Sequence, residues 1–324
     1  MSLSSEASLG ALRLQAQYRS DLQGNPSVTD AEWNTYISQS YKELYDLLVA
    51  AYGNDYYTAT TYQFNTTNSN LYPLPDGTTT YLNTDNTPAQ KFYKLLGVDL
   101  QYSSSPSGWI SLRRFEFIER NKYNYPNTAV NYSGYSNLRY RIEGNNLMLV
   151  PVPQTGQAVR LWYIPAPTSL AYLVPATIAV SGTVASMSNT YGIVQGMNVY
   201  GTGIQDRTTV SSVASTSITL SSSATATNPS AILTIWDDST SLDGIAGWEE
   251  YIIIDAAIKA QIKQENDIQP LLIQKAEITQ RIQAMAEGRD AGQAHHVSDA
   301  LSVNGWGGSY DGGWYGGFGD GSGW

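Results

Sequence analysis

The sequence of 324 residues contains no cysteine and only two histidines. Without cysteine the chain cannot form disulfide bonds or thiolate metal sites. The two histidines, His295 and His296, are neighbours beside a glycine-rich stretch, and an exposed linker explains them better than a metal or catalytic site does. We therefore expect no metal and no cofactor.

The sequence also lacks the motifs of common enzymes. It has neither a phosphate-binding loop ending in Lys-Ser/Thr nor a Gly-x-Ser-x-Gly elbow. Gly201–Gly203 lacks the third glycine and the following helix of a dinucleotide-binding loop, so a β-turn is the better interpretation. The carboxylates of Glu249 and Glu250 would point about 100° apart on a helix, and they suit its first turn better than glycoside hydrolysis. We expect a protein that is not an enzyme, with no catalytic residues.

Long apolar runs and a basic leader are missing as well. No stretch of about 18 apolar residues is present, as a membrane-spanning helix would require, and Met1–Gly10 is serine-rich without a basic start. These features predict no membrane anchor and no secretory signal, and they favour synthesis in a cytoplasm.

Charge is scarce, because charged residues make up only 14% of the chain, against about 25% in an average soluble protein. The net charge of −10 disfavours binding to a nucleic-acid backbone by counterion release. The acidity would suit a wall past which nucleic acid slides, and ordinary solubility explains it equally well. The 24 tyrosines are the largest unusual feature that is present. Because tyrosine and tryptophan are enriched where proteins meet proteins, they predict an assembly surface.

Two helical regions have clear sequence signals. Residues 7–18 predict a short first helix with Leu9, Leu12, Leu14 and Tyr18 roughly on one side. Thr29 and Glu32 have the spacing of a capping box and predict a helix over 29–50. An apolar stripe follows the cap at helical spacing: Trp33, Ile37, Tyr41, Leu44 and Leu48.

The second helical region covers 247–287. Asp267 is expected to cap a continuation in which Pro270 occupies the first turn, where its missing N–H costs nothing. The expected stripe comprises Trp248, Ile252, Asp255 or Ala256, Lys259, Ile262, Leu271, Gln274 or Lys275, Ile278, Ile282 and Met285. We expect the two regions to pack on each other through Trp33, Ile37, Leu44, Trp248, Ile252 and Ile278.

Between these regions the period changes to two, which is typical of strands. Tyr57–Phe64, with alternating β-branched and aromatic residues, predicts a strand. Phe92–Leu100 and Trp109–Ile118 are further strand or short-helix candidates. Tyr140–Pro151 predicts a hairpin that turns at Gly144–Asn146, and Ala158–Tyr163 is expected to pair next in a meander.

Residues 175–236 differ from their surroundings, because charge almost vanishes and Ser, Thr, Val and Gly dominate. Short strands between small polar turns predict a compact β-sandwich or barrel inserted into a loop of the main domain. The predicted fold class is α+β: a helical bundle packed on a small antiparallel sheet, with the inserted all-β module and a flexible C-terminal tail. The expected domains are 1–174 plus 237–302, the module 175–236 and the tail 303–324.

The tail is rich in glycine and spaced aromatics, with no core of its own. We expect it to order only when its aromatics dock on a partner. These aromatics are Trp306, Tyr310, Trp314, Tyr315, Phe318 and Trp324.

One basic cluster stands out in this acidic chain. Arg113, Arg114, Arg120 and Lys122 are interleaved with the aromatics Phe115, Phe117 and Tyr123 and with Glu116 and Glu119. Such interleaving can stack on nucleic acid. In an acidic, tyrosine-rich chain, however, we favour a subunit contact through Arg113, Arg114 and Arg120.

Three stretches of the sequence resemble one protein family. They are Asp30–Ile37 (DAEWNTYI); Phe115–Asn121 (FEFIERN) with Tyr140–Asn145 (YRIEGN) and Leu149–Pro153 (LVPVP); and Gly247–Lys259 (GWEEYIIIDAAIK) with Gln264–Asp267 (QEND) and Arg289–Gly292 (RDAG). On these stretches the chain resembles the head-to-tail adaptor, or connector, proteins of short-tailed double-stranded DNA bacteriophages.

The resemblance implies long helices packed around a small sheet and assembly into a ring, usually of twelve copies. The expected partners are the portal protein, a downstream tail or nozzle protein and other copies of the chain, with double-stranded DNA passing through the lumen without specific binding. The expected place is the virion neck, and the tail 303–324 is expected to dock on the portal or on a neighbouring copy. The β module and the aromatic tail depart from the family pattern.

Two other functions are considered as alternatives to an adaptor. A receptor- or glycan-binding tail appendage would use the tyrosine-rich surface and the β module, but the long repeats of tail fibres are missing. A wall hydrolase carried in the tail would need catalytic residues that the sequence does not display.

Overall fold

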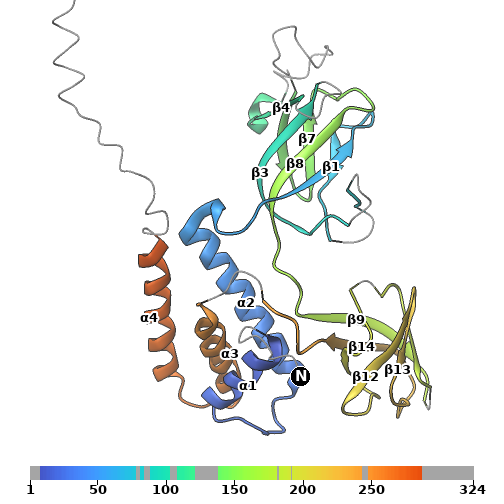
Figure 1. Cartoon of the computed structure of the whole chain (residues 1–324), viewed down its shortest axis with the longest axis vertical. Coiled ribbons are helices and arrows are strands. Elements are labelled where there is room, and N and C mark those ends of the chain that lie inside the picture. Colours follow the sequence, from blue (N-terminus) through green and yellow to red (C-terminus); the bar gives the residue numbers. More distant parts are fainter. Residues whose placement is uncertain are drawn as a thin grey trace, which may run out of the picture. The chain divides into compact units, whose positions relative to one another are not determined.

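The structure is a computed structural model, and it describes residues 8–77, 81–83, 88–102, 108–120, 138–180, 182–190, 192–242 and 247–286 (Figure 1). The helices are α1 (Leu9–Arg19), α2 (Asp30–Tyr52), α3 (Glu249–Lys263) and α4 (Gln269–Ala286), with short 3-10 helices η1 (Gly53–Asp55) and η2 (Phe117–Glu119). The strands are β1 (Thr60–Asn65), β2 (Leu71–Pro73), β3 (Phe92–Gln101), β4 (Trp109–Ser111), β5 (Arg113–Arg114), β6 (Arg139–Glu143), β7 (Asn146–Val150), β8 (Ala158–Pro165), β9 (Ala171–Ile178), β10 (Val184–Met187), β11 (Asn198–Tyr200), β12 (Thr208–Ala214), β13 (Ser217–Leu220) and β14 (Asn228–Trp236). The mixed α+β class predicted from the sequence is confirmed.

The helices share one hydrophobic core, to which α1, α2, α3 and α4 all contribute buried side chains. Helix α2 begins as its sequence predicts. The Thr29 side chain accepts from the Glu32 backbone N–H at 3.3 Å, and the Glu32 carboxylate accepts from the Thr29 N–H at 2.9 Å. All five residues of its predicted stripe are buried.

The buried side of helix α1 differs in part from the side that the sequence predicted. Leu9 and Leu12 are buried, but Leu14 and Tyr18 are 43% and 58% exposed. Leu14 lies two residues after Leu12 and therefore about 200° around the helix from it. The buried residue of the following turn is Ala16 instead.

Two four-stranded sheets, ordered β1-β8-β3-β4 and β2-β7-β6-β5, share a second hydrophobic core. The hairpin predicted at Gly144–Asn146 is confirmed, since β6 and β7 pair antiparallel around it. The expected meander is wrong. Strand β8 does not pair with the hairpin but lies between β1 and β3 in the other sheet, and β5 pairs with β6 in parallel.

The serine- and threonine-rich region forms a closed barrel in the order β10-β13-β12-β11-β14-β9, around a core of its own. Of the two predicted all-β forms, the barrel is therefore the one observed. Its first strand starts at Ala171, four residues before the expected boundary. Ala171 and Trp236, the two ends of the barrel segment, are Cα partners on adjacent strands.

Within the described ranges, no helix is long and apolar enough to cross a membrane. The tail 303–324, His295 and His296, and Lys122 and Tyr123 lie outside the residues that the structure describes.

Candidate functional site

The six residues expected at the helix interface all lie in the helical core. Trp33, Ile37, Leu44 and Ile252 are fully buried, and Trp248 and Ile278 are 7% and 9% exposed. They come from three helices, α2, α3 and α4, and from the residue that precedes α3.

The three arginines expected at a subunit contact lie on the surface. Arg113 and Arg114 form β5, Arg120 follows η2, and all three are exposed. Two guanidinium groups lie over the Phe117 ring, and their carbon atoms are 4.4 Å (Arg120) and 4.7 Å (Arg141) from the ring centre. Such cation–π stacking holds each guanidinium plane over the ring.

Strand pairing enlarges this cluster beyond what the sequence indicated. Because β5 and β6 are parallel neighbours, Arg113 lies beside Arg139 in the register. We call the resulting group the Arg–Phe patch, and it comprises Arg113, Arg114, Phe117, Ile118, Arg120, Arg139 and Arg141. No local sequence signal places the last two arginines beside the first two, because a parallel pairing between distant segments depends on the tertiary fold.

The Arg–Phe patch combines positive charge with exposed apolar surface. Residues 113–120 and 139–141 hold five arginines and two glutamates and therefore have a net charge of +3. Because the whole chain has a net charge of −10, the remaining residues together carry −13. Ile118 and Phe117 are 86% and 45% exposed. Arg113 and Arg114 make no ion pair with any described residue. The patch is therefore suited to an acidic partner with apolar or aromatic side chains.

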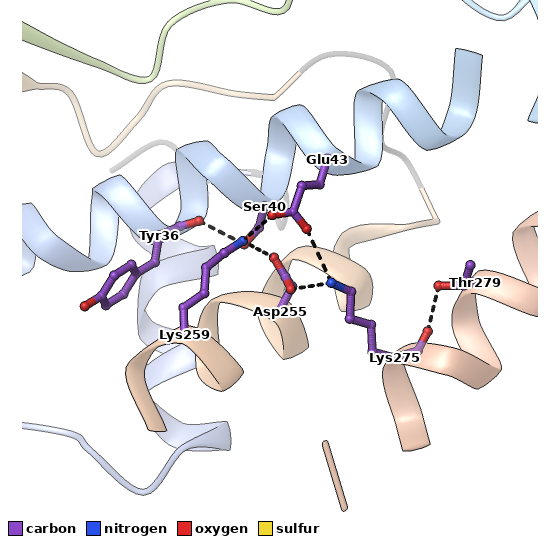
Figure 2. Close-up of polar contacts among 7 residues, drawn as sticks. All are labelled: Tyr36, Ser40, Glu43, Asp255, Lys259, Lys275 and Thr279. Atoms are coloured by element: carbon purple, nitrogen blue, oxygen red, sulfur yellow. Dashed lines mark hydrogen bonds and ion pairs between the residues drawn. The ribbon is translucent and has the colours of Figure 1, made fainter. Parts of the chain in front are cut away.

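A second charged group joins α2, α3 and α4 around the buried carboxylate of Asp255 (Figure 2). The carboxylate of Asp255, 4% exposed, contacts the ammonium groups of Lys259 on its own helix and of Lys275 on α4, the latter at 2.6 Å. Glu43 on α2 contacts the same two ammonium groups, at 2.8 Å to Lys259 and 3.3 Å to Lys275. Ser40 accepts from Lys259 at 3.1 Å and donates to the carbonyl of Tyr36.

The contacts in this ion network shift the pKa values of Asp255 and Lys275 in opposite directions. Burial alone would raise the pKa of Asp255, but hydrogen bonds from Lys259 and Lys275 outweigh burial and hold the pKa below its ordinary value. For Lys275, burial acts to lower the pKa, and the carboxylate of Asp255 more than compensates, so the pKa is raised. Both groups are therefore charged at neutral pH.

The ion network joins three helices through ion pairs. Its two carboxylates and two ammonium groups balance in charge, and each is already paired. Ion pairs to a buried carboxylate favour one arrangement of the helices, because moving a helix away would leave a buried charge without its partner. Lys275 thus fastens α4 to both α2 and α3. The apolar spacing places Asp255, Lys259 and Lys275 only on helix stripes, and nothing local in the sequence indicates that they pair.

A third polar cluster lies on the sheet β1-β8-β3-β4. The guanidinium of Arg160 stacks between Trp109 and Trp162, at 4.3 and 4.8 Å from the ring centres. Asp99 accepts hydrogen bonds from Arg160, from the indole N–H of Trp162 and from Ser111. Its partners are all internal, and the cluster ties three strands together.

The end of the barrel segment is fastened to α1. Arg13 makes two contacts to the carboxylate of Asp238, at 2.8 and 3.0 Å, and Asp238 also accepts from the Trp236 indole N–H. The backbone N–H of Gly10 donates to the carbonyl of Asp238 at 3.0 Å. A Cβ at Gly10 would lie only 3.0 Å from the Asp238 Cβ, closer than an ordinary contact, so this close approach favours glycine.

The remaining candidates have structural roles. Glu249 accepts from the backbone N–H of Gly247 and Glu250 pairs with Arg19, as expected of acids in the first turn of α3. In the part of the chain that the structure describes, no three His, Cys, Asp or Glu side chains gather to hold a metal ion.

Comparison with protein families identifies the chain. The family model described as "SU10 adaptor protein" matches residues 10–186, which is 177 of the 324 residues. The matched region contains α1, α2, both sheets and the first strands of the barrel, and it ends before the third stretch on which the adaptor resemblance rested. A search of curated protein sequences finds no significant match. The chain belongs to the SU10 adaptor protein family and is a structural adaptor protein of a bacteriophage virion.

Proposed function

We propose that this adaptor joins the phage head to its tail. In this proposal the copies form a ring, with twelve as the expected number, between the portal protein above and a tail or nozzle protein below. The observation that carries the proposal is the family match over residues 10–186. Specificity for a short-tailed phage rests on the sequence resemblance alone.

The distribution of charge supports a ring through which DNA passes. A closed ring of identical subunits needs two different, complementary surfaces on each copy. The Arg–Phe patch, at +3, faces outward from a chain whose remainder carries −13, so it complements the rest of a second copy. That acidic remainder would repel a phosphate backbone, which suits a passage that DNA crosses without binding.

Purified portal protein provides the direct test. Sedimentation velocity of the chain mixed with portal rings should show the chain co-sedimenting with the portal at a fixed stoichiometry. A chain that stays apart from the portal and sediments as a stable trimer would instead be a tail appendage.

We further propose that the barrel is a module inserted into the adaptor domain. Its ends, Ala171 and Trp236, are paired neighbours, so the chain leaves the barrel where it enters. Trp236 belongs to the helical core and must be retained. Replacing 172–235 by a two-residue Asn-Gly turn, which suits antiparallel partners, should leave portal binding intact. A folded deletion variant that no longer binds portal would make the barrel part of the docking surface.

A further inference from the structure

Two arginines of the Arg–Phe patch, Arg113 and Arg114, make no ion pair with any described residue. Two of its residues are exposed and apolar, Ile118 at 86% and Phe117 at 45%, and the guanidinium groups of Arg120 and Arg141 contact the Phe117 ring. Exposed aromatic and aliphatic side chains with an arginine rim are typical of protein interface centres. Phosphates would use the arginines but not Ile118, and Glu116 in the same segment would repel them, so a protein partner fits better than nucleic acid.

The partner must be acidic and aromatic, and one segment of the chain has that composition. Residues 303–324 contain Asp311 and Asp320, no lysine or arginine, and six aromatic side chains among ten glycines. Tryptophan and tyrosine are the strongest aromatic partners of guanidinium groups. Glycine lets a backbone approach a surface closely.

We propose that the Arg–Phe patch of one copy binds residues 303–324 of a neighbouring copy. This inference rests on the proposed ring and names the surfaces that would join its subunits. The aspartates would pair with Arg113, Arg114 and Arg141, and the aromatic rings would cover Phe117 and Ile118. Sixteen residues separate Ala286 from Val303, and at about 3.3 Å per residue they can span up to ~50 Å, which allows the segment to reach another subunit.

The test is a crosslink between isotopically labelled copies of the full-length chain. Copies with a photoreactive phenylalanine derivative in place of Trp314 are mixed in light and ¹⁵N-labelled forms, bound to portal rings, and irradiated. We expect mass spectrometry to show crosslinks from position 314 to residues 113–120 or 139–141 of a copy carrying the other label. If no complex with the portal forms, the same experiment on the concentrated chain alone still tests the contact between residues 303–324 and the Arg–Phe patch. Failure of portal binding can therefore be distinguished from failure of this proposal.

Charge reversal supplies the matched control. The triple variant Arg113→Glu/Arg114→Glu/Arg141→Glu should lower the crosslink yield at least tenfold while its melting temperature stays near that of the wild type. Lys42→Glu, at an exposed position of α2 where Lys42 makes no ion pair with a described residue, reverses one charge instead of three and should alter the yield less than twofold. Crosslinks to the portal, to another surface, or only within copies of one label would overturn the proposal, and so would a yield insensitive to the triple variant.

Discussion

Helices α3 and α4 follow each other in the chain and carry similar apolar spacings, yet their burial differs sharply. Helix α3 buries nine of its fifteen residues, including eight consecutive ones from Tyr251 to Ile258. Helix α4 buries only Ile278 and Ile282 of its eighteen, while Ile273 and Met285 are 60% and 55% exposed. An apolar stripe therefore identifies the side of a helix that can be buried, whereas the number of surrounding elements decides how much of that side is buried.

The two helices are also held by different forces. Helix α3 lies against α1 and α2 and gains mainly from burial of apolar area, about 25 cal/mol per Å². Helix α4 adds two isoleucines and the ammonium of Lys275. We expect α3 to unfold only with the helical core, and α4 to detach at a smaller cost in free energy.

The largest effect is expected from a charge placed inside α3. Ile252→Asp should prevent soluble folding, because an unpaired carboxylate in a fully buried position costs more than about 4 kcal/mol. Ile262→Asp makes the same change at a position of α3 that is 56% exposed, and it should leave the melting temperature almost unchanged. Equal soluble yields of the two variants would show that α3 is not the centre of the core.

The next effect concerns the ion network that joins the helices. Asp255→Ala should lower the free energy of unfolding by about 3–5 kcal/mol, because it leaves the ammonium groups of Lys259 and Lys275 facing each other without their buried carboxylate. Glu43→Gln, whose side chain is 47% exposed, should cost less than about 1 kcal/mol. Chemical denaturation of both variants measures the difference, and similar losses would contradict a central role for Asp255.

Shortening a core side chain of α4 should act locally. Ile282→Ala should cost about 2 kcal/mol, at the low end for a buried isoleucine, since α4 has few neighbours. Hydrogen exchange should accelerate in Gln269–Ala286 and stay unchanged in Glu249–Lys263. Equal acceleration in both helices would mean that α4 unfolds only with α3.

The pH dependence separates the network from the apolar core. The pKa of Asp255 is lower in the folded chain than in the unfolded chain. Its ionised carboxylate therefore stabilises the fold above the unfolded pKa of about 4, and this stabilisation is lost as the pH falls through the lower folded pKa. Because the pKa of Lys275 is raised, its contribution is present below about pH 10 and is lost as pH rises through the higher folded value. The stability difference between the wild type and Asp255→Asn should therefore be constant between about pH 5 and 9 and should narrow below about pH 4. A difference that stays constant into acid would show that folding does not lower the pKa of Asp255.

The smallest effect is expected on the exposed side of α4. Ile273→Ser should change the stability of the isolated chain by less than about 0.5 kcal/mol, because the side chain is 60% exposed. A loss above 1 kcal/mol in thermal melting would mean that another part of the chain covers this side.

What the sequence predicted correctly depended on local chemistry. The pair Thr29 and Glu32 fixes the start of α2 through two hydrogen bonds three residues apart, and Gly144 supplies the positive φ that the β6–β7 turn needs. The barrel was recognisable because its composition is uniform over about 60 residues.

What the sequence did not predict depended on pairing at a distance. Strand β8 pairs with β1 and β3, more than 50 residues earlier in the chain, and no feature of Ala158–Tyr163 selects these partners over the adjacent hairpin. The Arg–Phe patch was not predicted for the same reason, since Arg139 lies beside Arg113 only because β5 and β6 pair in parallel. Ile262 and Met285 continue their stripes but are exposed, because no element of the described chain covers them.

The central claim is that this family member forms a ring between head and tail, and a cryo-electron microscopy reconstruction of the virion neck tests it most directly. We expect a ring of density directly beneath the portal into which the helical core and the six-stranded barrel of each copy fit, with about twelve copies. Density for this chain at the far end of the tail, with none beneath the portal, would contradict the account.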